Sequence, residues 1–361
     1  MQRYDRQIRL EGFGMAKQQL LLQSSALIIG AGGLGVPVLQ YLCAMGIGKL
    51  GIVEHDDISI TNLHRQVLYT TAEQGRPKLH TAAAKLQQLN PDVQLELYDT
   101  YLDTDNALDI LAAYDVIVDC TDNFGSRYLI NDACVILNKP LVYGAIQQFN
   151  GQVSVFNHEG SATYRCLFPE PPGAGEAPDC NELGVLGVLP GIIGCHMANE
   201  VVKVLSKTGT PLAGQLLSIN ILDNQQQIFR FSPVPGNHNI TSLQEDYAQS
   251  VCNTGVLQSI EVEQLQQWLN NNTGVQLIDV REDHEWDICH IPQAIHIPMR
   301  QVAAVMHQWQ PQQRIAVLCH HGMRSRMIGQ QLVAAGFRNV YNVEGGIHAW
   351  SVKIDNEMMQ Y

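Results

Sequence analysis

A short apolar run that ends in a glycine-rich turn is the feature that most constrains this chain. Residues 25–30 read SALIIG, and a GAGGLG motif begins at the last of them. A helical pattern follows through Met45, and a second apolar run covers residues 50–54. Glycines between a strand and a helix let the backbone approach a phosphate at the positive end of the helix. The segment therefore predicts a strand–helix–strand unit that binds a nucleotide at its turn.

Further apolar runs alternate with helical patterns in the first two thirds of the chain. This alternation predicts a largely parallel sheet with helices on both faces. Two later runs, at residues 152–157 and 216–221, indicate antiparallel strands, so the predicted sheet is mixed. The glycine-interrupted run 183–198 predicts a buried helix, because it is shorter than the roughly 20 residues that span a bilayer. The other expected strands are 93–98, 116–120 and 141–145, and the other expected helices are 78–89 and 126–137.

The apolar pattern dissolves at residues 236–256, where Pro, Gly, Asn and Ser replace it. We interpret this stretch as a linker between a Rossmann-like domain at residues 1–235 and a smaller α/β domain at residues 257–361. The glutamine-rich patch at residues 225–227 is interpreted as too short to matter. The elements expected in the second domain are a helix at 260–269, strands at 275–280 and 315–318, and a helix at 325–335.

Charge and composition exclude several classes of function. The chain has 361 residues, with 22 Lys and Arg against 35 Asp and Glu, and its net charge of -13 offers no basic surface for nucleic acid. Its first ten residues, MQRYDRQIRL, lack the apolar core of a signal peptide. The nine cysteines show no regular disulfide framework. We therefore expect a cytoplasmic protein that binds neither nucleic acid nor a membrane.

Polar residues after the glycine turn distinguish between two nucleotides. Glu54, at the end of the second strand, can accept hydrogen bonds from the ribose of either NAD or ATP. Arg65 and Lys78 supply cations for a departing pyrophosphate, and Asp122 supplies a carboxylate for Mg²⁺. A hydride-transfer site needs few cations, so the combination favours ATP.

Six motifs together resemble the ubiquitin-activating-like adenylyltransferases of the MoeB/ThiF family: RYDRQIRL, GAGGLG, TNLHRQ, DCTDN, YRC and GVLGVLPGIIG. The resemblance covers residues 1–232. It implies that ATP adenylates the C-terminal glycine of a small ubiquitin-like sulfur carrier ending in Gly-Gly. It also implies a homodimer in which Arg6 reaches the nucleotide of the neighbouring subunit. The nucleotide contacts that it implies are Gly30, Gly32, Gly33, Gly35, Glu54, Asp56, Thr61, Asn62, Leu63, His64, Arg65, Gln66, Lys78, Asp122 and Asn123.

The sequence departs from the family pattern at its acidic residue and at its zinc site. Glu54 stands where the family usually has Asp. Thr163 replaces the first cysteine of a CxxC pair, which leaves Cys166, and SPVPGNHN stands in place of the second pair. One thiol cannot form the four-ligand site of a structural zinc, so no structural zinc is expected.

Four further cysteines of the first domain fall into two groups. Cys180 lies in a Pro/Gly-rich segment. It matches a crossover-loop cysteine of many family members, and the resemblance implies that this thiol forms a covalent link with the carrier. The alternative is an incidental loop thiol. Cys43, Cys134 and Cys195 fall in apolar helical patterns and are expected in the core.

A second reactive centre is expected at Cys319, between a strand and a helix that begins near Ser325. Backbone N–H groups, a positive helix end and Arg324 would all favour a thiolate there. The motifs LIDVREDHEW, HIPQAIHIP and VEGGIHAW resemble the rhodanese domain over residues 257–352. That resemblance implies a persulfide on Cys319, steadied by Arg324 and loaded by a cysteine desulfurase or another persulfide donor.

Several other residues of the second domain have non-catalytic interpretations. Asp279, Arg281 and His290 are expected to hold the scaffold together. His320 and His321 are interpreted as solvated tuning residues, because adjacent residues on a tight loop rarely converge on one metal ion.

The two centres together predict an adenylyltransferase joined to a sulfurtransferase. The carrier thiocarboxylate would serve molybdopterin synthesis, which the resemblance favours, or thiamine synthesis. Three alternatives stay open: an NAD-binding oxidoreductase fused to a sulfurtransferase, a non-adenylating carrier-binding scaffold with only rhodanese activity, and a cysteine phosphatase. The last is disfavoured because four residues separate Cys319 from Arg324, fewer than a phosphate-binding loop needs.

Overall fold

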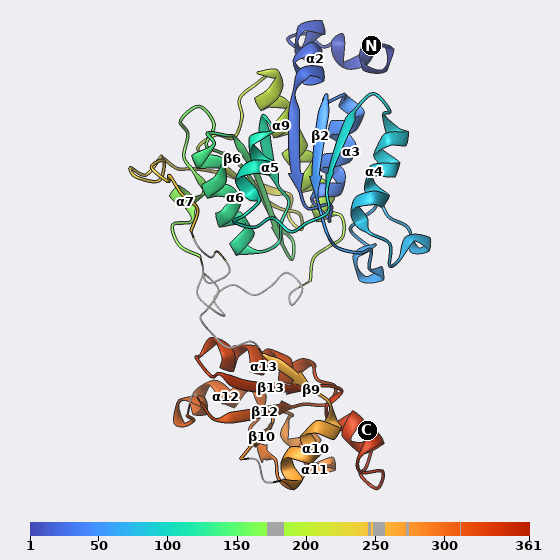
Figure 1. The fold of residues 1–361 in the computed structure, drawn as a ribbon, viewed down its shortest axis with the longest axis vertical. Helices are drawn as coiled ribbons and strands as arrows, with labels where there is room; N and C mark the ends of the chain where they lie inside the picture. The colour runs from blue at the N-terminus through green and yellow to red at the C-terminus, as the bar shows by residue number, and fades with distance from the viewer. Residues whose placement is uncertain (172–183, 245–246, 248–256, 272–273, 311) are drawn as a thin grey trace. The chain divides into compact units, whose positions relative to one another are not determined.

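The computed structural model describes residues 1–171, 184–244, 247, 257–271, 274–310 and 312–361. The described residues form two compact units (Figure 1). Those of Met1–Pro171 and 178–250 make up the N-terminal unit, and those of Val251–Tyr361 make up the C-terminal unit.

An eight-stranded mixed sheet forms the centre of the N-terminal unit, as the sequence predicts. Its order is β3-β2-β1-β4-β5-β6-β7-β8. The strands from β3 to β5 are parallel, and β6, β7 and β8 continue the sheet antiparallel. The strands are β1 (Ser25–Ile29), β2 (Lys49–Val53), β3 (Gln94–Tyr98), β4 (Val116–Asp119), β5 (Leu141–Gln147), β6 (Asn150–Phe156), β7 (Gln215–Asn220) and β8 (Gln225–Arg230).

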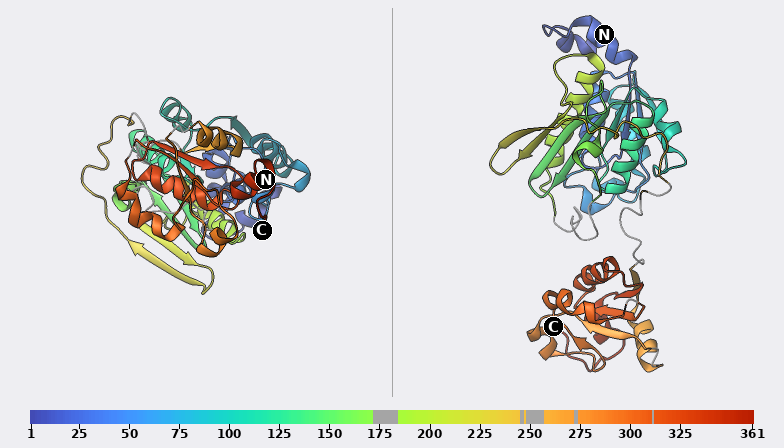
Figure 2. Two further views of the ribbon diagram at one scale, coloured as in Figure 1. Left: turned by 90° about the horizontal axis from the view of Figure 1, so that it is seen from below. Right: turned by 90° about the vertical axis from the view of Figure 1, so that its left-hand side faces the viewer.

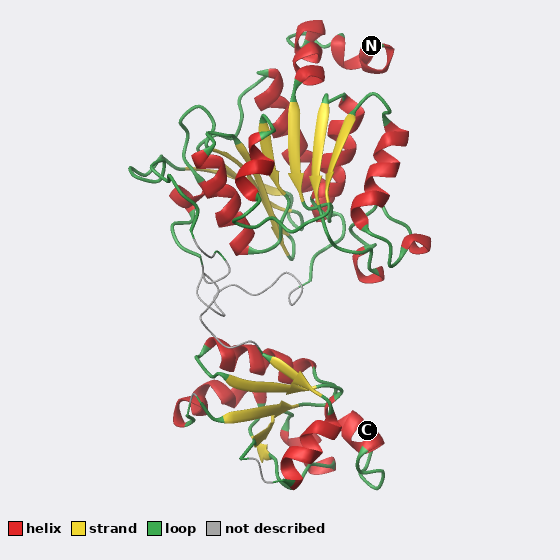
Figure 3. Cartoon of the chain, in the orientation of Figure 1, coloured by secondary structure: helices red, strands yellow, loops and turns green. Residues whose placement is uncertain are grey.

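Alternating side chains of each central strand feed two separate cores, one on each face of this sheet. In β1, Ala26 and Ile28 join one apolar cluster, whereas Leu27 and Ile29 join the other. Helices α3 and α9 cover the first face, and α5 and α6 cover the second (Figure 3). The helices described in this unit are α1 (Asp5–Ile8), α2 (Gly14–Gln23), α3 (Gly35–Met45), α4 (Lys78–Leu89), α5 (Ala107–Ala112), α6 (Phe124–Ile136), α7 (Tyr164–Leu167) and α9 (Leu189–Ser206).

Two expectations for this unit are wrong in detail, and one further segment finds its place in the sheet. Helix α9 begins at Leu189 rather than at residue 183, because Pro190 presets the helical backbone of its first turn. Cys195 lies on the exposed side of that helix, whereas Cys43 and Cys134 are buried as expected. The glutamine-rich patch belongs to strand β8, whose hairpin with β7 lies at the edge of the sheet (Figure 2).

A five-stranded parallel sheet forms the C-terminal unit, in the order β11-β10-β12-β13-β9. Apolar clusters lie on both of its faces. The expected first helix begins two residues late, because residues 258–260 instead form the edge strand β9. The strands are β9 (Gln258–Ile260), β10 (Gln276–Asp279), β11 (Ile295–His296), β12 (Arg314–Leu318) and β13 (Asn339–Val343), and the helices are α10 (Val262–Asn270), α11 (Asp283–Ile288), α12 (Met299–Val305), α13 (Met323–Ala334) and α14 (Gly346–Lys353).

None of the helices in the described part of the chain is both long enough and apolar enough to cross a membrane.

Candidate active sites

A cavity of about 640 Å³ opens where β1, β2 and β4 end in the N-terminal unit. Its lining includes Ile29, Val53 and Cys120, each at or just beyond the carboxyl end of one of these strands. The sheet order changes direction at β1, which lies between β2 and β4. Ligands of open α/β sheets bind at such a switch point, and this volume is typical of a small-molecule site.

The glycine-rich turn forms one wall of this cavity, through Gly30, Gly32 and Gly33. Gly30 has a φ of +97°, a backbone conformation that disfavours any side chain. Gly35 does not line the cavity. Instead it packs against the turn, where an added Cβ would lie 1.9 Å from the carbonyl oxygen of Gly30.

Gly35→Ala should therefore destabilise the N-terminal unit, by about 1–3 kcal/mol or more, because the methyl group would displace the turn. Gly32→Ala is the matched control, since its Cβ would meet only Gln66 Nε2, at 3.4 Å. All four tryptophans lie in the C-terminal unit. Calorimetry should show a lower unfolding temperature for the N-terminal unit in Gly35→Ala. The unfolding temperature of the C-terminal unit, followed by tryptophan fluorescence, should be unchanged. An unchanged calorimetric profile would contradict the steric argument.

The carboxylate of Glu54 ties β2 to the glycine turn. One of its oxygens accepts a hydrogen bond from Ala31 N at 2.9 Å. The other accepts from His55 N and Asp56 N, each at 2.8 Å. Glu54 is buried and lines the cavity. Its contact with a ribose stays a prediction, whereas its role in shaping the turn is visible in these three bonds.

Two cations face this cavity from different elements. Lys78 begins α4 and is almost fully buried, and its Nζ lies 2.9 Å from Asp56 Oδ2. Arg65 follows the short helical turn Ile60–Asn62 and donates to Asn62 Oδ1 at 2.8 Å. Asp122 lies in the loop after β4 and lines the same cavity. The structure thus gathers the positive groups and a carboxylate that the sequence assigned to ATP.

Most of the expected nucleotide contacts line this one cavity. Leu63 does not, because it packs against the small apolar cluster around Tyr69, and Arg6 lies exposed on α1 outside the lining. Cys180 lies outside the described residues. The expected residues that do line the cavity are Gly30, Gly32, Gly33, Glu54, Asp56, Thr61, Asn62, His64, Arg65, Gln66, Lys78, Asp122 and Asn123.

Sequence reasoning missed a third cation, Arg127. It is buried on the first turn of α6 and lines the cavity. Its guanidinium donates to Thr121 O at 3.3 Å and lies over the rings of Phe124 and Tyr143. The signal was available, since the helix that follows β4 starts beside the expected site and Arg127 is five residues beyond Asp122.

Cys166 has hydrogen-bond donors around it. Its sulfur lies 3.2 Å from Val234 N, 3.4 Å from Thr163 Oγ1 and 3.5 Å from Asn237 Nδ2. Burial alone would raise the pKa of this thiol, but these hydrogen bonds bring the pKa below its ordinary value. The SPVPGNHN segment therefore contacts Cys166 through its own donors.

In the C-terminal unit, Cys319 lies between β12 and α13 and is 1% exposed. Its sulfur accepts from Gly322 N at 3.1 Å and from Ser325 Oγ at 3.3 Å. Helix α13 begins at Met323, two residues before the expected start. The loop thus holds the thiol at the positive end of a twelve-residue helix, where negative charge is stabilised.

Arg324 points to a different partner from the one expected. Its two terminal nitrogens make a bidentate ion pair with Glu285, each at 2.6 Å. The hydrogen bonds found for this guanidinium thus go to Glu285 rather than to Cys319. The pair lowers the pKa of Glu285 to about 2.

Glu285→Gln should destabilise the C-terminal unit at pH 7 by at most about 3 kcal/mol. The folded-state pKa lies below the ordinary value of 4.5, so the stabilisation is complete above that pH and is lost as the pH falls toward 2. The free energy of unfolding can be measured with urea and followed by tryptophan fluorescence. The difference in this free energy between variant and wild type should therefore disappear in acid. Glu357→Gln, at an exposed position, is the control. A gap that is constant with pH would contradict the ion-pair origin.

Two of the three expected scaffold residues form a fully buried ion pair. Arg281 Nη2 lies 2.6 Å from Asp279 Oδ2, and neither side chain is exposed. His290 is exposed and stacks on Trp286 with a ring separation of 4.2 Å. The ion pair between Arg281 and Asp279 fixes the end of β10, which lies next to β12, the strand that Cys319 follows.

Comparison with protein families gives one match for each unit. The ThiF family model matches residues 4–240, and the rhodanese-like domain model matches residues 261–353. The chain belongs to the ThiF family. The family match covers the cavity, and the rhodanese match covers Cys319.

Relatives of this ThiF-family chain extend over its whole length. Adenylyltransferase and sulfurtransferase MOCS3 of Arabidopsis thaliana is 36% identical over an alignment of 394 positions, which covers 99% of this chain and 85% of that protein. The probable adenylyltransferase/sulfurtransferase MoeZ of Mycobacterium tuberculosis is 37% identical over an alignment of 372 positions, which covers 99% of this chain and 95% of that protein. These names confirm the enzyme class expected from the sequence.

Two further comparisons each cover about two thirds of this chain. A sulfur carrier protein adenylyltransferase of Thermus thermophilus is 53% identical over 228 residues, 62% of this chain and 84% of that protein. The crystal structure of E. coli MccB matches with a TM-score of 0.57 and 19% identity, over 67% of this chain and 72% of that one. The latter likeness shows the shared fold.

Proposed function

We propose that this ThiF-family chain adenylates the C-terminal glycine of a ubiquitin-like sulfur carrier and then converts it into a thiocarboxylate. The observation that carries the proposal is the single cavity lined by a glycine turn, three cations and Asp122. A hydride-transfer site would have no use for this many phosphate-directed charges. The Thermus relative is named for acting on a sulfur carrier, which supports the same substrate class.

In the first step, a carboxylate oxygen of the carrier attacks the α-phosphorus of ATP. The bond from that phosphorus to the bridging oxygen breaks, and pyrophosphate leaves. Arg65, Lys78 and Arg127 would stabilise the charge on the departing group. Asp56 is already paired with Lys78, so Asp122 is the carboxylate that would hold Mg²⁺, which neutralises phosphate charge when bound.

In the second step, the terminal sulfur of a Cys319 persulfide attacks the acyl carbon, and the bond to AMP breaks. A second thiol, for which we propose Cys180, then attacks the Cys319 sulfur. The carrier leaves as its thiocarboxylate, and a disulfide remains that an external thiol reduces. Tethering the persulfide to the activating unit favours this transfer over hydrolysis, because it raises the effective concentration of the nucleophile.

Four further features belong to this proposal. A cysteine desulfurase or a similar persulfide donor would load Cys319. The chain would act as a homodimer, with Arg6 reaching the neighbouring nucleotide. The carrier favoured is the small-subunit type of molybdopterin synthase, ahead of a thiamine-pathway carrier. No structural zinc would be bound at Cys166, whose sulfur takes its hydrogen bonds from protein donors.

Carrier-dependent exchange between ATP and labelled pyrophosphate tests the first step directly. We expect exchange with a carrier that ends in Gly-Gly and none with the same carrier lacking its last glycine. NAD should neither support nor inhibit the exchange. Absence of exchange with every Gly-Gly carrier would overturn the adenylation proposal and leave only the sulfurtransferase function.

A further inference from the structure

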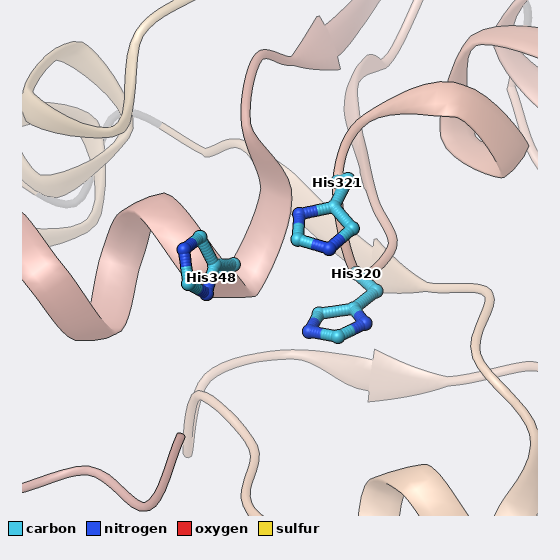
Figure 4. A group of neighbouring side chains, drawn as sticks. All are labelled: His320, His321 and His348. Atoms are coloured by element: carbon cyan, nitrogen blue, oxygen red, sulfur yellow. The ribbon is translucent and has the colours of Figure 1, made fainter. Parts of the chain in front are cut away.

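Three histidines gather beside the Cys319 loop, although the sequence presented only two of them as neighbours. His320 and His321 lie in the loop, and His348 lies on α14 (Figure 4). One ring nitrogen from each can be chosen so that all three lie within 4.8 Å of one another. Two adjacent residues on a tight loop do not by themselves enclose an ion. The third imidazole comes from a separate helix, so it can approach the ion from a different side.

Backbone hydrogen bonds fix α14 against the loop. Ile347 N donates to Cys319 O at 2.9 Å, and His348 N donates to His320 O at 3.1 Å. Gly346 permits this approach, because a Cβ there would lie 2.3 Å from Cys319 O and 2.4 Å from His320 O. The Cα positions of the three histidines are therefore set by the fold, and only their side chains need to turn.

The imidazole group is also accessible to a metal ion. His321 and His348 are exposed, so an ion can reach the group from solvent. The rings of His320 and His321 are stacked 4.1 Å apart with 19° between their planes, so the rings must turn before their nitrogens point at one shared ion.

We propose that His320, His321 and His348 form a binding site for Zn²⁺ or a similar divalent transition metal ion, next to the Cys319 loop. Three imidazole nitrogens leave one of the four zinc positions open for water or an outside ligand. The nitrogens of a tetrahedral zinc site lie about 3.4 Å apart, given Zn–N bonds of about 2.0–2.1 Å. Rotation of the imidazole side chains would bring their nitrogens from the present spacing, within 4.8 Å, to that value.

Metal binding should also reduce sulfur transfer. The ion would bridge the loop to α14, and so hold closed a loop whose cysteine is only 1% exposed. Because Cys319 must meet both its persulfide donor and its acceptor, a fixed loop would slow both reactions. The inhibition should be reversed by a chelator, since it requires no covalent change.

Co²⁺ binding to the full-length chain, followed by visible absorption, tests the site. Wild type should give the intense bands of a four-coordinate ion. His348→Ala should weaken binding by at least about 100-fold, since losing even outer-shell partners of a metal costs about 10–100-fold. His307→Ala removes an exposed imidazole of the same unit outside the group and should bind as wild type does. Thermal melting checks that each variant is folded.

Two thiol variants separate this site from metal bound by cysteine. Cys319→Ala and Cys166→Ala should both keep the Co²⁺ bands. If the bands survive in His348→Ala, or vanish in Cys319→Ala together with a thiolate charge-transfer band, the proposal is overturned. Zn²⁺ inhibition of thiosulfate-dependent sulfur transfer should follow the same pattern, being strong in His307→Ala and weakened by about 100-fold in His348→Ala.

Discussion

Cys319→Ala should abolish formation of the carrier thiocarboxylate while leaving carrier-dependent pyrophosphate exchange within about twofold of wild type. Loss of a catalytic nucleophile commonly costs 10⁴-fold or more, and we expect a fall of at least about that size. Exchange should survive because the glycine turn, the cations and Asp122 all belong to the other unit. Mass spectrometry of the carrier measures the first quantity, and label exchange measures the second.

Cys289→Ala is the matched control for this experiment. Cys289 lies in the same unit and is half-buried, and its carbonyl accepts a hydrogen bond from Arg281 that the substitution preserves. We expect near wild-type thiocarboxylate formation from it. A Cys319→Ala enzyme that still makes thiocarboxylate would show that sulfur reaches the carrier without this thiol.

Asp122→Asn should have the opposite effect on the two activities, because it should impair adenylation and spare sulfur transfer. Pyrophosphate exchange should fall by about 10²- to 10³-fold. This is the usual cost of removing one electrostatic group from a charge-stabilising site. The amide keeps the size of the side chain and loses the charge that would hold Mg²⁺. Raising the Mg²⁺ concentration should restore part of the activity. Rhodanese turnover of thiosulfate should be unchanged, because Cys319 lies in the other unit.

Asp109→Asn is the control for loss of one negative charge. Asp109 is exposed on α5 and lies outside the cavity lining. Exchange in this variant should equal that of wild type. If both Asp variants lost activity alike, or if Asp122→Asn kept full exchange without extra Mg²⁺, the metal-holding role of Asp122 would be wrong.

Local patterns predicted the architecture well where one residue type decides the geometry. The apolar run at residues 25–30 predicted a strand, and the structure places its neighbouring residues Ala26 and Leu27 in opposite cores. The span of α4 was predicted residue for residue as Lys78–Leu89. Strand β8 was not predicted, because its six residues are all exposed and show no alternation of apolar and polar side chains.

Side-chain partners were harder to predict than elements, because they depend on distant residues. Arg324 follows Cys319 closely in the sequence, yet it pairs with Glu285, 39 residues away. Leu63 lies within a polar motif, yet its apolar side chain packs into a cluster behind it. His348 joins its two partners only because α14 folds back onto the loop. The spacing of residues along the chain does not predict such contacts between distant residues.

The order in which the strands pair has a consequence for biosynthesis. In the C-terminal unit, β9 is the first strand made, and it pairs with β13, with Gln258 opposite Tyr341. At about 5–20 residues per second, the ribosome needs roughly 4–16 s to deliver that partner. The N-terminal sheet, by contrast, has received its last strand once Arg230 is made. The nascent chain thus completes its nucleotide-binding sheet while the edge of the sulfurtransferase sheet still waits, and it is this later interval that most needs protection by chaperones.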